Sequence, residues 1–149
     1  MEIHLKDCSS KWFDWVIEAK ESVVVFTPYF DQLLIDIFDE STLPKSEITL
    51  VTQLDWGDAG SNSFHKVRNI LKMNQMGIDV RILDRLHAKI LIVDWDRAIL
   101  GSQNFTNYST GSVEISCEVD RYGDNFDEAF EGFESLLSNS RPFSLSDLH

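Results

Sequence analysis

Residues 86–106 read LHAKILIVDWDRAILGSQNFT, and this stretch predicts two neighbouring segments of a β-sheet. Its two apolar runs, 90–93 and 98–100, have the length and the composition of buried strands. Side chains alternate between the two faces of an extended chain, so His87 and Lys89, two residues apart, point the same way. The fold prediction therefore begins with a sheet that carries an imidazole and an ammonium on one face.

The end of the same stretch adds a hydroxyl and an amide. Ser102 and Asn104 are also two residues apart, and they share a face if the chain stays extended there. A phosphodiester centre needs these groups, because an imidazole can attack phosphorus while the other three donate to the anionic oxygens. The pattern therefore predicts that these two side chains converge with His87 and Lys89 on a phosphate.

The compound spacing, His-x-Lys-x4-Asp followed by Gly-Ser-x-Asn, resembles the signature of the phospholipase D superfamily. The match runs from His87 to Asn104, and the layout of the chain from about residue 10 to residue 138 is compatible with it. A lone His-x-Lys would carry almost no information, whereas the compound pattern is specific. The resemblance implies an α/β sandwich and a phosphodiesterase activity.

The resemblance also implies roles for single residues. His87 would be the nucleophile that forms a phosphohistidine, or the general acid that protonates the leaving oxygen. Lys89 and Asn104 would bind the phosphate oxygens, with Ser102 beside them. These four residues form the centre of the expected catalytic site.

Two further parts of the family pattern concern acidic residues. In such proteins a downstream acid orients the histidine through its other ring nitrogen; Glu114 fits that place best, and Glu118 is the alternative. Asp94 is the motif aspartate and is included among the candidate catalytic residues. It follows His87 by seven residues, an odd number, so a regular strand turns it to the opposite face. We therefore expect Asp94 to form hydrogen bonds at the end of a strand and not to touch the substrate.

We expect the substrate to contact side chains around this centre, namely those of Arg85, Gln103, Tyr108 and Trp56. Trp56 lies in the most loop-like interior segment, LDWGDAGSNS at 54–63. Its indole could stack on a base, belong to a lid, or simply pack as an ordinary aromatic. The sequence leaves these three alternatives open.

Only one such motif is present. His4, His65 and His149 lack the Lys, Asp and Gly-Ser-x-Asn spacing, and no internal repeat is visible. Because the family reaction uses two histidines, we expect a C2 homodimer in which His87 of each copy faces a single composite site. No His/Cys/Asp cluster has metal-ligand spacing, so the expected mechanism requires no metal and no other cofactor.

The charge of the chain is unusual for an enzyme that acts on nucleic acid. The net charge is −12, whereas phosphate contacts usually require a basic surface. The segment 65–89 differs from the rest: it holds six Lys and Arg residues against two Asp residues. A local positive groove on an acidic body is therefore expected, with weak and salt-dependent affinity for long duplexes. The acidic surface is also compatible with a further protein subunit that supplies affinity.

Composition narrows the class of protein. Hydrophobic content of 43% and charged content of 26% are typical of a globular domain. No apolar run approaches the roughly 18 residues that a membrane span needs, and residues 1–4 do not resemble a signal peptide. Cys8 and Cys117 have no paired spacing, which favours free thiols and a reducing, cytoplasmic setting without stable membrane association.

Periodicity and turn residues predict a mixed sheet flanked by helices, the fold class α/β. Residues 1–138 are expected to form one catalytic domain, and 139–149 a polar tail or the start of a linker. The expected helices are 10–20, 31–39, 64–76 and 125–137; the expected strands are 22–27, 47–53, 78–83, 86–93, 98–101 and 113–119.

The sequence thus favours a metal-independent phosphodiesterase, in particular a nuclease that acts through a phosphohistidine. Two alternatives remain open. One is a phospholipid or small phosphodiester hydrolase of the same family. The other is a nucleic-acid-binding module without catalytic activity.

Overall fold

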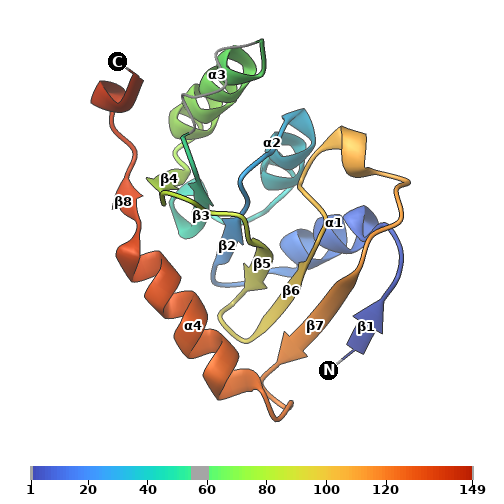
Figure 1. Ribbon diagram of the computed structural model, residues 1–149. Helices are drawn as coiled ribbons and strands as arrows, with labels where there is room; N and C mark the ends of the chain where they lie inside the picture. Colours follow the sequence, from blue (N-terminus) through green and yellow to red (C-terminus); the bar gives the residue numbers. More distant parts are fainter. Residues whose placement is uncertain (1, 55–60, 149) are drawn as a thin grey trace.

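A computed structural model describes residues 2–54 and 61–148, and within them the chain forms one eight-stranded mixed sheet with four α-helices (Figure 1). The strands are β1 (Glu2–His4), β2 (Val23–Phe26), β3 (Ile48–Thr52), β4 (Asp79–Ile82), β5 (Lys89–Val93), β6 (Arg97–Gly101), β7 (Ser116–Asp120) and β8 (Arg141–Pro142). The helices are α1 (Ser9–Glu18), α2 (Gln32–Asp39), α3 (Ser61–Gln75) and α4 (Phe126–Asn139), with short 3-10 turns η1 (Lys45–Glu47), η2 (Asn107–Ser109) and η3 (Leu145–Leu148).

The strand order is β1-β7-β6-β5-β2-β3-β4-β8. The strands β2, β3 and β4 are parallel, and the helices α2 and α3 provide the crossovers between them. The remaining pairs are antiparallel. The predicted α/β class with a mixed central sheet is therefore confirmed.

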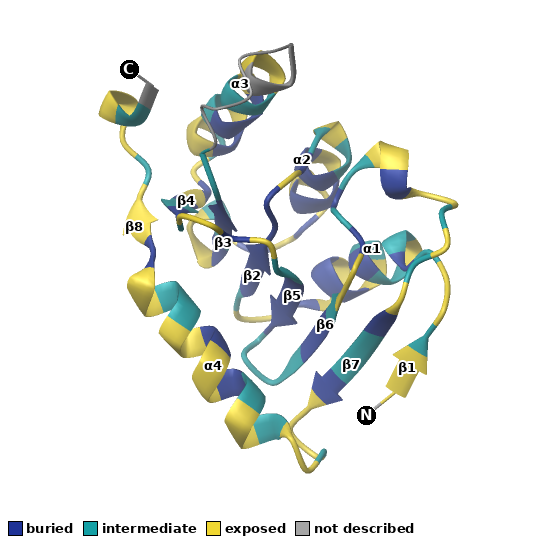
Figure 2. Cartoon of the chain, in the orientation of Figure 1, coloured by how far each residue is buried: buried dark blue, intermediate teal, exposed yellow. Residues whose placement is uncertain are grey.

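The strand β2 shows why the sheet is covered on both faces. Its four residues, VVVF, are all buried. Val23 and Val25 belong to a core cluster under α1, α2 and α3, whereas Val24 and Phe26 belong to a second cluster under α4. The central strands are accordingly the most deeply buried part of the chain (Figure 2).

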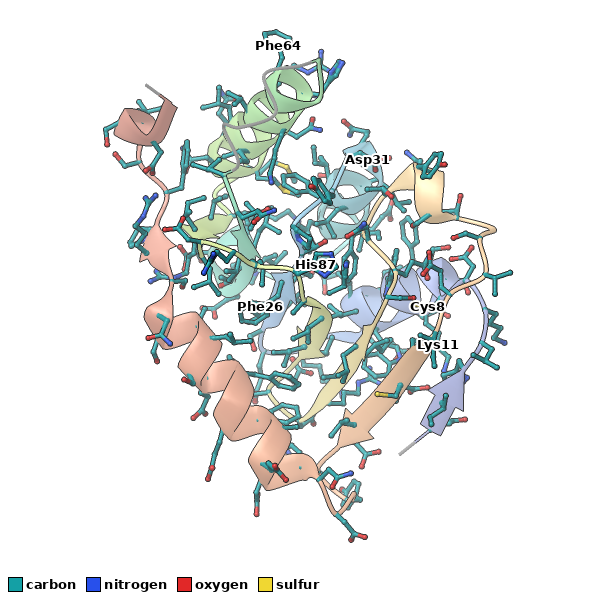
Figure 3. The ribbon with its side chains drawn as sticks, in the orientation of Figure 1. Cys8, Lys11, Phe26, Asp31, Phe64 and His87 are labelled. Carbon is teal, nitrogen blue, oxygen red and sulfur yellow. The ribbon has the colours of Figure 1, made fainter. Side chains whose placement is uncertain are left out.

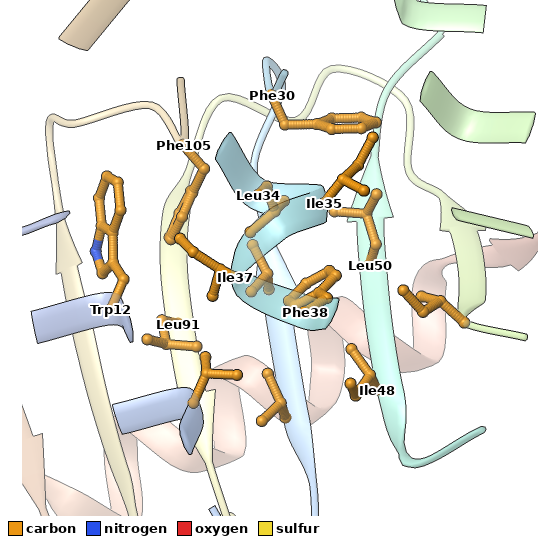
Figure 4. Packing of buried hydrophobic residues seen from close by; sticks show 14 of the residues in the cluster. Trp12, Phe30, Leu34, Ile35, Ile37, Phe38, Ile48, Leu50, Leu91 and Phe105 are labelled. Carbon is orange, nitrogen blue, oxygen red and sulfur yellow. The ribbon is translucent and has the colours of Figure 1, made fainter. Parts of the chain in front are cut away.

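Helix α2 illustrates how the larger core is built. Its apolar residues Leu34, Ile35, Ile37 and Phe38 are all buried, and they pack over the central strands (Figure 4). Asp31 begins the helix by accepting a hydrogen bond from the Leu33 N–H at 2.9 Å, which is an N-cap contact.

The two edge strands, β1 and β8, were not predicted from the sequence. The strand β1 has three residues and β8 has two, which is too short for a period-2 pattern to stand out. Residues 139–149 were expected to be a tail or a linker, but 141–142 pair with β4 and the Arg81 side chain donates to Ser140. This segment therefore completes the sheet.

Each helix among the described residues is too short or too polar to span a lipid bilayer.

Candidate active site

The candidate site lies at the edge of the sheet where the parallel strands β2, β3 and β4 end and β5 begins. Ligands of open α/β sheets commonly bind at the carboxyl ends of parallel strands. At this edge the registers place Lys89 of β5 opposite Gly101 of β6, and Gly101 opposite Ser116 of β7. The loop 102–115 between β6 and β7 therefore starts beside Lys89 and ends at the same edge of the sheet, one strand further away.

His87 and Lys89 occupy the beginning of β5. His87, labelled in Figure 3, is exposed and lies two residues before the strand. Lys89 is the first residue of the strand and is half-buried. The Lys89 ammonium lies 3.3 Å from Nδ1 and 3.4 Å from Nε2 of His87. Partial burial lowers the pKa of Lys89 below its usual value, while the Glu114 carboxylate opposes that shift. The structure thus places the imidazole and the ammonium side by side.

Ser102 and Glu114 form a second pair at the same edge. The Ser102 hydroxyl donates to Oε2 of Glu114 at 2.5 Å and accepts from the Ile115 N–H at 3.1 Å. The Ser112 hydroxyl donates to the other carboxylate oxygen at 3.0 Å. Two hydroxyls therefore hold the Glu114 carboxylate beside Lys89.

The two acids considered for orienting His87 have different surroundings. Glu118 accepts from the Lys11 ammonium at 2.5 Å and contacts His4 Nε2 at 2.5 Å. Burial alone would raise the pKa of Glu118, but these partners lower it. Glu118 is thus engaged away from the motif, and Glu114 is the acid at the site. In the part of the chain that the structure describes, no hydrogen bond joins Glu114 to His87.

Gly101 makes the close approach of β6 and β7 at the site feasible. A Cβ at this position would lie 2.1 Å from the Ile115 carbonyl oxygen and 2.8 Å from the Ser116 Cα. Both atoms belong to the backbone, so they cannot move aside cheaply. The close packing of the two strands therefore explains why the first residue of the Gly-Ser-x-Asn string is a glycine.

Asn104 follows in a loop that its neighbours hold in place. Its carbonyl accepts from the Ser109 hydroxyl at 2.7 Å and from the Thr106 N–H at 2.9 Å. Its side-chain Oδ1 is buried and has no hydrogen-bond partner among the described residues. Such an amide has polar capacity that the protein itself does not use.

The expectation that Gln103 contacts substrate does not fit the structure. Its side chain is only 3% exposed. It accepts from the Cys8 N–H at 3.0 Å and donates to Asp7 at 2.7 Å, so it ties the N-terminal segment to the loop 102–115. Burial alone would raise the pKa of Asp7, but hydrogen bonds from Gln103, Ser9 and Gly111 lower it to about 2. Gln103 is a structural residue.

Asp31 and two aromatic side chains fix the outer part of the loop. The Asp31 carboxylate accepts from the Asn107 N–H at 2.8 Å, and its own N–H donates to the Phe105 carbonyl at 3.4 Å. The Phe105 ring stacks on Trp12 of α1, with centroids 4.2 Å apart. The sequence showed Asp31 only as a helix cap, because its second contact joins residues 76 positions apart.

Asp94 lies at the other end of β5 from His87. Its carboxylate accepts from the N–H groups of Lys20, Glu21 and Ser22, at distances between 2.7 and 3.1 Å. At about 3.3 Å per residue, the strand from Lys89 to Val93, which lies between Asp94 and His87, alone spans about 13 Å. Asp94 therefore fastens the chain that leads into β2, as its odd spacing indicated, and it does not belong among the catalytic residues.

Three further residues were expected to contact the substrate, namely Arg85, Tyr108 and Trp56. Arg85 is exposed in the turn between β4 and β5, with a left-handed backbone (φ 61°). Tyr108 is 97% exposed on η2, in the loop 102–115. Trp56 lies outside the described residues.

One group among the described residues has metal-ligand geometry. The ligand atoms of Glu2, His4 and Glu118 lie within 4.8 Å of one another. The Lys11 ammonium, however, lies 2.5 Å from Glu118 and 3.2 Å from His4 Nε2, so it supplies the positive charge there. These residues link β1, β7 and α1 as an ion-pair network, and no role in the chemistry of His87 follows from them.

The comparisons with known proteins agree with this architecture. The family model described as "Cardiolipin synthase, PLD-like domain" matches residues 15–133. A phospholipase D family member, Nuc from Salmonella typhimurium, has a TM-score of 0.70 at 16% identity, over 95% of this chain and 97% of that one. NucT from Helicobacter pylori has a TM-score of 0.68 at 15% identity, over 95% and 99%.

Phosphatidylserine synthase from Haemophilus influenzae has a TM-score of 0.70 at 12% identity, over 95% of this chain but 39% of that one. At these identities the structural likeness concerns the fold. No curated protein sequence matches the chain.

Proposed function

Since this chain belongs to the family of phospholipase D-like domains, we propose that it is a metal-independent phosphodiesterase and that its substrate is nucleic acid. The observation that carries the proposal is the contact of the Lys89 ammonium with both ring nitrogens of His87, at 3.3 and 3.4 Å. Ser102 and Glu114 lie at the same sheet edge, and Asn104 follows in the loop that begins there. An imidazole beside phosphate-binding donors is the arrangement that nucleophilic attack on a phosphodiester requires.

The proposed reaction has two steps. In the first, a ring nitrogen of His87 forms a bond to phosphorus, the bond from phosphorus to the leaving oxygen breaks, and that oxygen receives a proton from a second imidazole. In the second, water attacks the phosphohistidine, its proton returns to the second imidazole, and His87 is released. Lys89 and Asn104 stabilise the charge on the non-bridging oxygens in both steps.

The second imidazole would come from the partner subunit's His87, across a two-fold axis. Exposed apolar side chains near the site support such self-association: Tyr108 is 97% exposed, Val113 is 92% exposed and Ile115 is 51% exposed. All three lie in the loop 102–115 that starts beside Lys89. Exposed apolar residues gathered on one loop are typical of an interaction surface.

Charge supports nucleic acid as the substrate. Helix α3 carries Lys66, Arg68 and Lys72, Arg85 follows in the turn before the motif, and Lys89 is in the site. The body of the protein is acidic, so contact with the substrate would be confined to this region. The fold shared with phosphatidylserine synthase keeps a phospholipid as the second candidate substrate.

The test compares substrates in the presence of excess chelator. Single-stranded DNA, duplex DNA, RNA, phosphatidylglycerol vesicles and a chromogenic phosphodiester are incubated with wild type, with His87→Ala and with His65→Ala. His65 is exposed on α3 and serves as the matched histidine control. We expect cleavage of a nucleic acid by wild type and His65→Ala, and none by His87→Ala. With a ³²P-labelled substrate, label bound to the wild-type protein should be lost in acid and kept in alkali, because a phosphohistidine is acid-labile and alkali-stable.

Two results would contradict the proposal. Cleavage that requires added Mg²⁺, or that survives in His87→Ala, would remove the histidine mechanism. Sedimentation analysis tests the composite site separately, because an active monomer would be incompatible with two histidines from two copies. A rate that follows a bell-shaped pH curve, with limbs that belong to the coupled pair, would agree with it.

A further inference from the structure

A groove lies beside α4. This helix covers the face of the sheet opposite α1, α2 and α3 (Figure 1). The volume of the groove is about 290 Å³, at the lower end of the range of about 300–1,000 Å³ for ligand pockets. It therefore has room for one or two side chains. The residues that line it are Trp95, Phe126, Asp127, Phe130, Glu131 and Glu134.

The apolar part of the groove is aromatic. The rings of Phe126 and Phe130 lie 4.3 Å apart, and Trp95 meets Phe130 edge-on at 6.2 Å. Phe130 is buried, whereas Trp95 and Phe126 remain partly exposed. An indole and a phenyl ring thus remain accessible to solvent in part.

Trp95 holds its place at a conformational cost. It occupies the turn between β5 and β6, which the Asp96 N–H closes by donating to the Val93 carbonyl at 3.2 Å. Asp94 and Trp95 both have left-handed backbones, with φ of 56° and 51°. Such turns favour Asn and Gly, and a bulky residue at positive φ is an outlier. Asp94 uses the conformation to bind the backbone of residues 20–22, whereas the Trp95 ring packs against the second core cluster, where it meets Phe130.

The rim of the groove is acidic on one side. Asp127, Glu131 and Glu134 lie at positions i, i+4 and i+7 of α4, so they form one row along the helix. All three are exposed, and among the described residues no lysine or arginine lines the groove. Phosphate groups are repelled here, and a cation is attracted.

An arginine side chain fits this combination. Its guanidinium stacks on an indole face and binds carboxylates through two donors at once. The protein already contains the stacking half of such a contact, since the Arg97 guanidinium lies 4.1 Å from the Trp15 ring centroid.

We propose that this groove binds a short basic segment of a partner protein, with an arginine seated on Trp95 and Phe126 and paired with Glu131 and Glu134. The site lies at the far end of the sheet from His87, so the proposal is independent of the reaction assigned to that residue. A bound partner would leave the edge with the motif accessible.

The test uses the amidated peptide RLRRLR and its control QLQQLQ, titrated into the ¹⁵N-labelled full chain. We expect a Kd below about 1 mM for the basic peptide, with the largest shifts at the Trp95 indole and in α4, and no binding of the control peptide. The double variant Glu131→Lys/Glu134→Lys should weaken binding by about tenfold or more.

A charge-matched control separates the groove from general electrostatics. Asp39→Lys/Glu40→Lys changes the net charge by the same amount at two exposed positions at the end of α2. It should alter Kd by no more than about twofold. Equal weakening in both double variants, shifts centred away from Trp95, or no binding at 1 mM would overturn the proposal. Dimerisation lost only in Glu131→Lys/Glu134→Lys, without peptide binding, would assign the groove to a second copy of the chain.

Discussion

Replacing Gly101 with Ala tests how closely β6 and β7 must approach at the site. The added Cβ would lie 2.1 Å from the Ile115 carbonyl oxygen, whereas a carbon and a carbonyl oxygen in contact are about 3.3 Å apart. The strands would have to separate by about 1 Å, which is the difference between these distances. The Ser102 N–H, which donates to the same carbonyl at 2.9 Å, would lose that bond.

The magnitude follows from two contributions. Overpacking costs about 1–3 kcal/mol, and a lost backbone hydrogen bond costs about 1 kcal/mol more. We therefore expect Gly101→Ala to lower the free energy of unfolding by about 3 kcal/mol, measured by urea titration followed through tryptophan fluorescence. Folded Gly101→Ala should also turn over substrate more slowly, because Ser102 and Glu114 move with the strands.

Gly132 provides the control substitution. It lies within α4, and a Cβ there would meet no described atom within 4 Å apart from the adjacent residues and backbone of its own helix. Ala is about 1 kcal/mol more favourable than Gly inside a helix, so Gly132→Ala should stabilise the protein by about that amount. If Gly101→Ala stays within about 0.5 kcal/mol of wild type while Gly132→Ala behaves as expected, the argument from close approach is wrong.

Three further predictions concern residues that hold the scaffold. Asp94→Ala should lower the free energy of unfolding by about 2–3 kcal/mol, because three N–H groups lose their acceptor. Turnover per folded molecule should stay unchanged. A loss of turnover without a loss of stability would show that Asp94 acts in the reaction and not in the scaffold. The pKa of Asp7 is lowered to about 2 in the folded protein, so its contribution to stability is present above about pH 4 and is lost as the pH falls toward 2. The urea midpoints of wild type and Asp7→Asn should therefore converge between about pH 4 and pH 2. A constant difference between the midpoints would contradict this prediction. Burial raises the pKa of the Cys8 thiol to about 11, so iodoacetamide at pH 8 should label it far more slowly in the native protein than in urea, as mass spectrometry can measure; equal rates would show that Cys8 is not packed as described.

The centre of the sheet was predictable because its strands are buried on both faces. A run such as VVVF in β2 admits few other conformations, and the expected helices followed from apolar spacing. The edges were not predictable in the same way. The strands β1 and β8 are held by their partners β7 and β4, and their own sequences contain too few residues to show alternation.

Within the site, the alternation of side chains between the two faces of an extended chain also predicts where Gln103 lies, although Gln103 was expected to contact the substrate. Ser102 and Asn104 were placed on one face, and the same rule turns Gln103 between them toward the interior, where the structure has it. No such rule separates Glu114 from Glu118, which differ by an even number of residues. Their difference arises from Lys11 and His4, which are more than 100 positions from Glu118 and reach it only in the folded chain.

The position of Asp94 has a consequence for mutational scans of proteins with this motif. A screen that scores total activity in cells would report His87 and Asp94 as equally intolerant, and both would enter a list of catalytic positions. Normalising the signal to the amount of native protein should separate them, since under the proposed mechanism one substitution removes a reacting group and the other reduces the yield of folded chains. A three-letter signature can therefore record two unrelated selective pressures, one on rate and one on maturation.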